Sequence, residues 1–156
     1  MRREATSGRA ELAIRIRRAR PDERLELERI QRRAALANPE YRLQLEEHPD
    51  ALELGAAEFG RGTTLVADRE GGPCGFALML FDGPGAELDG LFVDPPFWGQ
   101  GIGRRLVEHA VHEARRLGLS LTVTSGPRSV EFYRSCGFAV EGETGTRFGP
   151  AFRMSR

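Results

Sequence analysis

The sequence predicts an α+β domain in which a mixed, mainly antiparallel sheet of seven strands carries helices on both faces. In the middle of the chain, three strand segments are separated by short turns, so they pair as an antiparallel meander. A long amphipathic helix then leads to a further strand, and this connection implies a parallel pair within the same sheet. The chain has 156 residues, 40% of them hydrophobic, which suffices for one core but not for two. We therefore expect a single domain over residues 12–156 behind an N-terminal tail, residues 1–11.

The first third of the chain alternates between strand and helix patterns. Residues 12–18 alternate apolar side chains with Arg, as a half-buried strand does. Pro21 begins a helix whose apolar residues fall on one face and which ends before Pro39. Two further helical pieces are expected over residues 40–47 and 50–58.

The pattern of residues 63–156 predicts six strands and two helices. The strands are expected over residues 63–68, 75–81, 86–93, 119–124, 138–142 and 147–154. The longer helix covers residues 102–117, where apolar residues form a continuous stripe and Gly118 ends the helix. A short helix is expected over residues 129–136.

Composition excludes several classes of function. The 23 basic residues equal the 23 acidic ones, which disfavours binding to nucleic acid or to a membrane surface by bulk electrostatics. No apolar stretch approaches the roughly 18 residues of a membrane span. Cys74 and Cys136 are too few for a disulfide framework, as is usual in a reducing cytoplasm. We therefore expect a cytoplasmic protein that binds neither nucleic acid nor membrane.

The segment that carries chemistry is LFVDPPFWGQGIGRRL, residues 91–106. It joins a strand end to a helix through alternating glycines, whose backbone N–H groups can converge on a phosphate. A dinucleotide fingerprint would need its third glycine at Arg104 or Leu106, so neither register fits. A Walker loop needs a Lys, and the chain has none.

This segment and a second one, VEFYRSCGF at residues 130–138, resemble two motifs of the GCN5-related N-acetyltransferase (GNAT) superfamily. The resemblance extends from about residue 14 to residue 154 and implies the acyl-CoA N-acyltransferase fold. It also implies that acetyl-CoA is the co-substrate, without a metal. The acetyl group would pass directly to an amine of a small molecule or peptide.

The resemblance also implies roles for individual residues. Leu91, Phe92 and Val93 match the strand that pairs with the pantetheine arm of the cofactor. The residues that match the pyrophosphate-binding loop and helix start are Trp98, Gly99, Gln100, Gly101, Ile102, Gly103 and Arg104. Tyr133 resembles the general acid that protonates the leaving thiolate, and an ordinary pKa of about 10 keeps its proton in place at neutral pH.

The general base is left open between two carboxylates and ordered water. Glu87 and Asp89 lie two residues apart on one predicted strand, so they share a face, and Leu91 and Val93 are expected to continue it. Carboxylates amid apolar neighbours have raised pKa values that suit a base.

Four residues outside these motifs carry side chains that are common in functional sites. His109 and His112 lack a metal-binding motif, and we expect them on a solvated helix face. Tyr41 and His48, near a predicted helix break, are candidates for lining the acceptor pocket.

Two positions depart from the family pattern. Trp98 stands where the family usually has Arg or Gln, and Gly126 stands where it often has Asn. These departures favour an alternative, a catalytically silent acyl-CoA-binding or sensor domain of the same fold.

If the chain self-associates, we expect a homodimer, because this is the commonest homo-oligomer.

Overall fold

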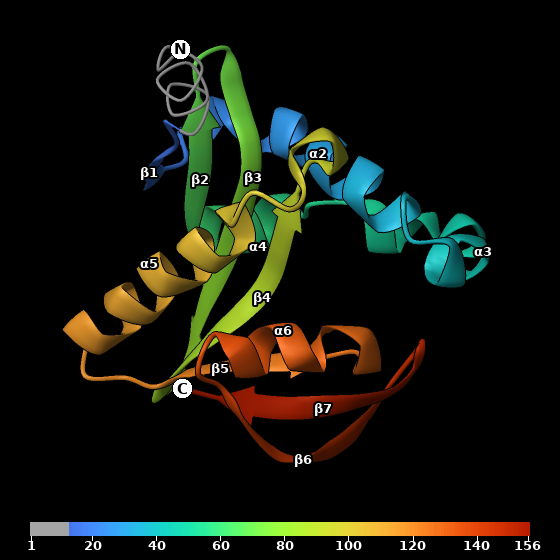
Figure 1. Ribbon diagram of the computed structural model, residues 1–156, viewed down its shortest axis with the longest axis vertical. Helices are drawn as coiled ribbons and strands as arrows, with labels where there is room; N and C mark the ends of the chain where they lie inside the picture. Colours follow the sequence, from blue (N-terminus) through green and yellow to red (C-terminus); the bar gives the residue numbers. More distant parts are fainter. Residues whose placement is uncertain (1–12) are drawn as a thin grey trace, which may run out of the picture.

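The computed structural model describes residues 13–156, which contain one seven-stranded sheet in the order β1-β2-β3-β4-β5-β7-β6 (Figure 1). The strands are β1 (Arg15–Arg18), β2 (Thr63–Arg69), β3 (Gly72–Asp82), β4 (Gly85–Val93), β5 (Leu121–Ser125), β6 (Ala139–Thr146) and β7 (Gly149–Ser155). All neighbouring strands are antiparallel except β4 and β5, which are parallel. This confirms the predicted fold class. The tail predicted for residues 1–11 lies outside the described residues.

Helices cover both faces of the sheet. They are α2 (Arg24–Leu36), α3 (Pro39–Glu47), α4 (Ala56–Arg61), α5 (Ile102–Arg116) and α6 (Val130–Ser135), with 3-10 turns η1 (Pro21–Glu23), η2 (Pro49–Leu52), η3 (Pro95–Phe97) and η4 (Pro127–Ser129). None of the helices within residues 13–156 is long and apolar enough to cross a membrane.

Two apolar clusters hold these layers together. On one face, the predicted stripe of α5, which includes Leu106 and Val107, is buried against the strands and α6 as far as Ala114, whereas Leu117, just after the helix end, is 57% exposed. On the other face, Leu27 and Ile30 of α2 pack against Phe76 and its neighbours in β2 and β3. Burying each such side chain contributes about 1.5–3 kcal/mol, so the sheet is anchored from both sides.

The helix predicted over residues 50–58 is wrong as a single element. The chain instead forms η2 and α4, and Glu53 between them is extended (φ −89°, ψ 138°). Leu52 and Leu54 are both buried. Side chains two residues apart share a side in an extended chain but not in a helix, so burying both leucines interrupts the helix.

The parallel strands β4 and β5 separate part-way along their length, as Figure 1 shows. Their pairing ends at Leu88, which lies opposite Met79 of β3. Gly90 lies opposite Leu78, the next residue of β3, so Asp89 is an extra residue in a β-bulge. Beyond this bulge, β4 is paired with β3 alone, and its other edge faces the gap between β4 and β5.

A buried ion-pair network ties β1 to the start of α2. Glu23 is only 3% exposed and accepts two hydrogen bonds from the Arg17 guanidinium, at 2.9 and 2.7 Å. The Arg20 backbone N–H donates a further bond at 2.7 Å. These contacts, chiefly that from Arg17, lower the pKa of Glu23 to about 2 against the opposing effect of burial.

Candidate active site

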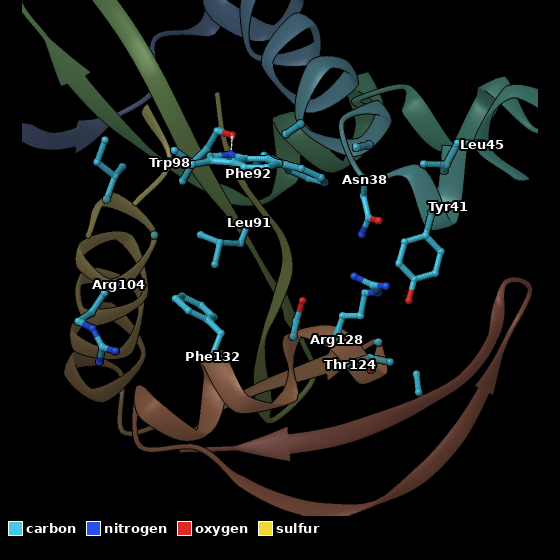
Figure 2. A pocket seen from close by; sticks show the side chains of 18 of the residues that line it. Asn38, Tyr41, Leu45, Leu91, Phe92, Trp98, Arg104, Thr124, Arg128 and Phe132 are labelled. Carbon is cyan, nitrogen blue, oxygen red and sulfur yellow. Dashed lines mark hydrogen bonds between the residues drawn. The ribbon is translucent and has the colours of Figure 1, made fainter. Parts of the chain in front are cut away.

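A cavity of about 910 Å³ lies where β4 and β5 separate (Figure 2). Leu91 and Val93 line it from the face covered by α5, and Phe92 lines it from the face covered by α2. The cavity therefore passes through the sheet. Its size is typical of sites for cofactors and small substrates.

The backbone of β4 offers hydrogen-bonding groups to this cavity. The Asp94 N–H donates to the Cys74 carbonyl at 2.8 Å, which makes these two residues a hydrogen-bonded pair. Such pairs alternate along an antiparallel ladder, so the N–H and C=O groups of Leu91 and Val93 point away from β3, towards the gap. The backbone of Phe92 points to β3 instead, and its side chain lines the cavity. An extended ligand can therefore pair with β4 through Leu91 and Val93.

The glycine loop delivers the start of α5 to the same cavity. Gly99 and Gly101 both have φ of +78°, a conformation that glycine adopts without a Cβ clash. The first hydrogen bond of the helix runs from the Arg105 N–H to the Gly101 carbonyl. The N–H groups of Ile102, Gly103 and Arg104 therefore have no helical acceptor, and with the helix dipole they favour an anion.

The segment before this loop is tied to two other elements. Asp94, which is 8% exposed, accepts two hydrogen bonds of 2.9 Å from the Arg33 guanidinium of α2. The guanidinium of Arg69 lies 4.4 Å from the centre of the Phe97 ring. Bidentate Arg–carboxylate pairs have a defined geometry, so these contacts fix where the loop begins.

Three polar residues predicted to bind the cofactor lie in different settings. Trp98 lines the cavity, is 51% exposed, and donates from its indole N–H to the Val93 carbonyl at 2.6 Å. Arg104 also lines the cavity, and its guanidinium donates to the carbonyl and hydroxyl of Ser135, both at 2.8 Å. Gln100 is exposed and does not line the cavity. The indole therefore occupies part of the free edge of β4.

Tyr133 lies behind the cavity wall. Its ring packs against Phe132, which lines the cavity, and against Phe138, with ring centres 5.1 and 5.5 Å apart. The residue is 7% exposed, and burial raises the pKa of its hydroxyl above the usual value. The Tyr133 hydroxyl has no hydrogen-bond partner among residues 13–156. It is nevertheless not among the fully buried, unpartnered side-chain oxygens of these residues, a group that contains Thr64 Oγ1 alone. The Tyr133 hydroxyl therefore keeps some contact with solvent.

The β-bulge corrects the predicted arrangement of the two carboxylates. Leu91 and Val93 pack on the α5 face with Leu88, so they do not continue the face of Glu87 and Asp89. The extra residue at the bulge shifts the alternation of side chains by one position. Glu87 and Asp89 are both exposed and lie on the opposite face.

Neither carboxylate lines the main cavity. Asp89 instead lines a smaller cavity of about 410 Å³, and Phe92 lines both cavities. Partial burial raises the pKa of Glu87, as does the charge of Asp89. Burial also raises the pKa of Asp89, with a further contribution from Glu58. Both groups have the raised pKa expected of a base, but neither lies at the main cavity.

The cavity also contains residues that the motifs did not identify. Asn38 and Arg128 lie at the end opposite Arg104, close to Tyr41 (Figure 2). His48, the other acceptor-pocket candidate, does not line the cavity but packs edge-on against Phe148, which does. Arg128 could have been anticipated, because ligands bind at the carboxyl ends of parallel strands and Arg128 follows β5 in the turn η4. Asn38 carries no comparable signal.

Comparison with known proteins identifies the family. The pattern of the Acetyltransferase (GNAT) family matches residues 27–138. The chain belongs to this family. It is 36% identical over 139 residues to the peptidyl-lysine N-acetyltransferase YjaB of Salmonella typhimurium, covering 85% of this chain and 88% of that protein. The same-named protein of Escherichia coli K12 is 34% identical over 134 residues, covering 85% and 87%.

Solved structures agree with this assignment. The solution structure of apo YjaB from Escherichia coli superposes with a TM-score of 0.67 at 33% identity, over 92% of this chain and 97% of that one. The PaiA N-acetyltransferase from Thermoplasma acidophilum, crystallised with coenzyme A, has a TM-score of 0.75 at 21% identity, over 92% and 98%, which shows the fold. This GNAT protein is an N-acetyltransferase that uses acetyl-CoA, as the sequence predicted.

Proposed function

We propose that acetyl-CoA binds along the free edge of β4 and that the acceptor amine enters the cavity from the side of α2 and α3. The observation that carries this proposal is the passage through the sheet between β4 and β5. One end of the passage has the free N–H groups of α5, and the other has polar side chains. The two substrates can thus approach a common centre from opposite faces.

The α5 side of the passage suits the cofactor. The N–H groups of Ile102, Gly103 and Arg104 would hold the pyrophosphate. Leu91 and Val93 would pair with the amides of the pantetheine arm. A pantetheine amide that bonds to the Val93 carbonyl takes the place of the Trp98 indole, because both donors need the same oxygen.

Acetyl transfer in this cavity is a direct displacement. The amine nitrogen attacks the thioester carbonyl, a C–N bond forms, and the C–S bond breaks. The amine loses a proton and the departing thiolate gains one. We assign the proton for the thiolate to Tyr133, whose raised pKa keeps the hydroxyl protonated. We assign the amine proton to Glu87 or Asp89 through ordered water, since neither carboxylate lines the cavity.

The names of the relatives guide the choice of acceptor. Two of them are peptidyl-lysine N-acetyltransferases, which supports an amine of a lysine side chain or of a small molecule.

We also propose a cytoplasmic location, because Cys74 and Cys136 are free thiols, as is usual in a reducing compartment. A homodimer stays a prediction.

Turnover with a panel of amines tests the function. The purified chain is mixed with acetyl-CoA and with small amines or a lysine peptide, and the release of CoA thiol is measured against a reaction without amine. We expect amine-dependent release, together with an acetylated product identified by its mass. Tight binding of acetyl-CoA without transfer to any amine would instead support the silent acyl-CoA sensor.

A further inference from the structure

We propose that the Trp98 side chain competes with the cofactor for β4. In the free protein its indole takes the position of a pantetheine amide, and CoA must displace the indole to bind. This inference rests on the proposed cofactor site and adds a residue that sets how tightly this site holds CoA. It depends on one hydrogen bond of the indole and on how few other contacts hold the ring.

The indole N–H donates to the oxygen that an extended ligand needs. It bonds to the Val93 carbonyl at 2.6 Å (Figure 2). This carbonyl points away from β3 and towards the gap, because the neighbouring Asp94 bonds to Cys74 of β3. A ligand amide that pairs with this edge offers the same kind of donor to the same oxygen. The indole therefore makes, in the free protein, a contact that the pantetheine arm would make in the complex.

The two donors compete for space as well as for the oxygen. A carbonyl oxygen has two lone pairs, so a second donor alone would not displace the first. The indole nitrogen is part of a rigid double ring, however, and a 2.6 Å contact places that ring against the edge of β4. Both Trp98 and Val93 line the cavity. An extended arm that follows the strand edge therefore needs the volume that the indole fills.

Few other contacts hold the indole in place. Trp98 is 51% exposed and belongs to neither apolar cluster. Among residues 13–156 its ring makes no ring-to-ring contact. The neighbouring Phe97, by contrast, packs against the larger cluster and against the Arg69 guanidinium. Exposed side chains change rotamer within nanoseconds, so displacing the indole breaks one hydrogen bond and leaves the core intact.

This competition lowers the affinity for the whole cofactor. An indole has one donor and no acceptor, so Trp98 cannot bond to Val93 and to a cofactor group at the same time. The net strength of one neutral hydrogen bond leaves roughly a tenth to a third of the free protein open. The apparent affinity falls by that fraction. Because the indole returns to Val93 when CoA leaves, it also favours release of the product.

Calorimetric titration of wild type and Trp98→Phe tests the inference. Phe keeps a ring at this position but has no N–H. We expect CoA to bind Trp98→Phe roughly 3- to 10-fold more tightly than wild type, and to inhibit acetyl transfer correspondingly more strongly. The matched ligand is 3′-phospho-ADP, the half of CoA that lacks the pantetheine arm. It should bind both proteins equally, because it does not extend along β4 to Val93.

A second measurement follows the indole in the unaltered protein. Trp98 is the one Trp of the chain, so its indole N–H gives a single signal in a proton–nitrogen NMR spectrum. In the free protein this proton should be shifted downfield and exchange slowly with water, because it is hydrogen-bonded. Saturating CoA should move the signal upfield and speed the exchange. Saturating 3′-phospho-ADP should leave the exchange slow.

A control variant separates this effect from the loss of an exposed apolar side chain. Leu117, just after α5, is 57% exposed and does not line the cavity. Leu117→Ala should bind CoA and 3′-phospho-ADP as the wild type does. A gain of CoA affinity in both Leu117→Ala and Trp98→Phe would contradict a specific role of the indole.

Two further results would overturn the inference while leaving acetyl transfer intact. One is unchanged or weaker CoA binding by Trp98→Phe, which would make the indole a bystander or a ligand of the cofactor. The other is an indole signal that keeps its shift and slow exchange at saturating CoA. If CoA binds but no amine is acetylated, the proposed function fails, and both measurements still decide the role of Trp98. If CoA binds to neither protein, the cofactor site and this inference fail together.

Discussion

Replacing Gly101 by Ala tests whether the loop before α5 holds the cofactor. Gly101 has φ +78° and ψ 12°, and a Cβ atom there would meet nothing within 4 Å. The substitution therefore introduces backbone strain without a steric clash. For an L-residue this left-handed conformation costs about 1–2 kcal/mol. The loop is exposed and can relieve that strain by changing conformation, which would disperse the N–H groups at the helix start.

The strain translates into a measurable loss of affinity. If CoA must restore the left-handed conformation to bind, affinity falls about 5- to 30-fold, from the 1–2 kcal/mol above. CoA at about 100 times the wild-type Kd adds roughly 2.7 kcal/mol of stability, or a Tm rise of about 5–11 °C for a chain of this size. A tenfold weaker variant keeps about 1.4 kcal/mol at the same concentration. Its Tm rise should therefore be about half as large.

Gly118 provides a matched control at the other end of the same helix. It has φ +73°, and a Cβ atom there also meets nothing within 4 Å. Gly118→Ala should therefore lower the Tm of the free protein but leave the CoA-induced rise unchanged. The assay is thermal unfolding with and without CoA, supported by fluorescence titration of Trp98, the one Trp of the chain. A full CoA-induced rise in Gly101→Ala, or an equal loss in both variants, would refute the loop assignment.

Three further variants address the catalytic groups and the fold. Tyr133→Phe keeps the ring packing, so Tm and CoA affinity should persist while kcat falls about 100-fold; turnover within threefold of wild type would contradict an acid role. Burial raises the pKa of Glu87, so Glu87→Gln should slow the reaction most at a pH above that pKa and below the pKa of the acceptor amine, where the carboxylate is ionised and the free amine is scarce, with partial rescue as pH rises further. An unchanged shape of the pH profile would leave Asp89 or water as the base. Glu23→Gln should cost about 3 kcal/mol at pH 7 in denaturant unfolding, from a pKa lowered from 4.5 to about 2. That difference should shrink as pH falls from 4.5 to 2, and a constant difference would contradict the ion-pair account.

The placement of Tyr133 and the two carboxylates shows where local patterns stop being informative. A four-residue spacing to Gly137 locates Tyr133 on a short helix before a strand, as observed. That spacing does not say whether the ring reaches the cavity or stands behind Phe132, because this depends on how α6 packs against the sheet. Likewise, period-two alternation predicts one face for Glu87 and Leu91, but the bulge at Asp89 depends on the register of β3.

The sequence by itself predicted the seven strands, the parallel pair and the glycine loop, and its resemblance to the GNAT superfamily implied the cofactor. The strands and the loop depend on residues within about 20 positions of one another, where side-chain periodicity and turn chemistry act directly, and the parallel pair follows from the order of strand, helix and strand. Only the tertiary structure decided that Arg128 and Gly126 meet Asn38 and Tyr41, from segments more than 80 residues apart in the chain. Such contacts arise from the separation of β4 and β5 and from the approach of the Tyr41 side chain, on α3, to Gly126 after β5. No local pattern encodes them, because they form only when the chain closes on itself.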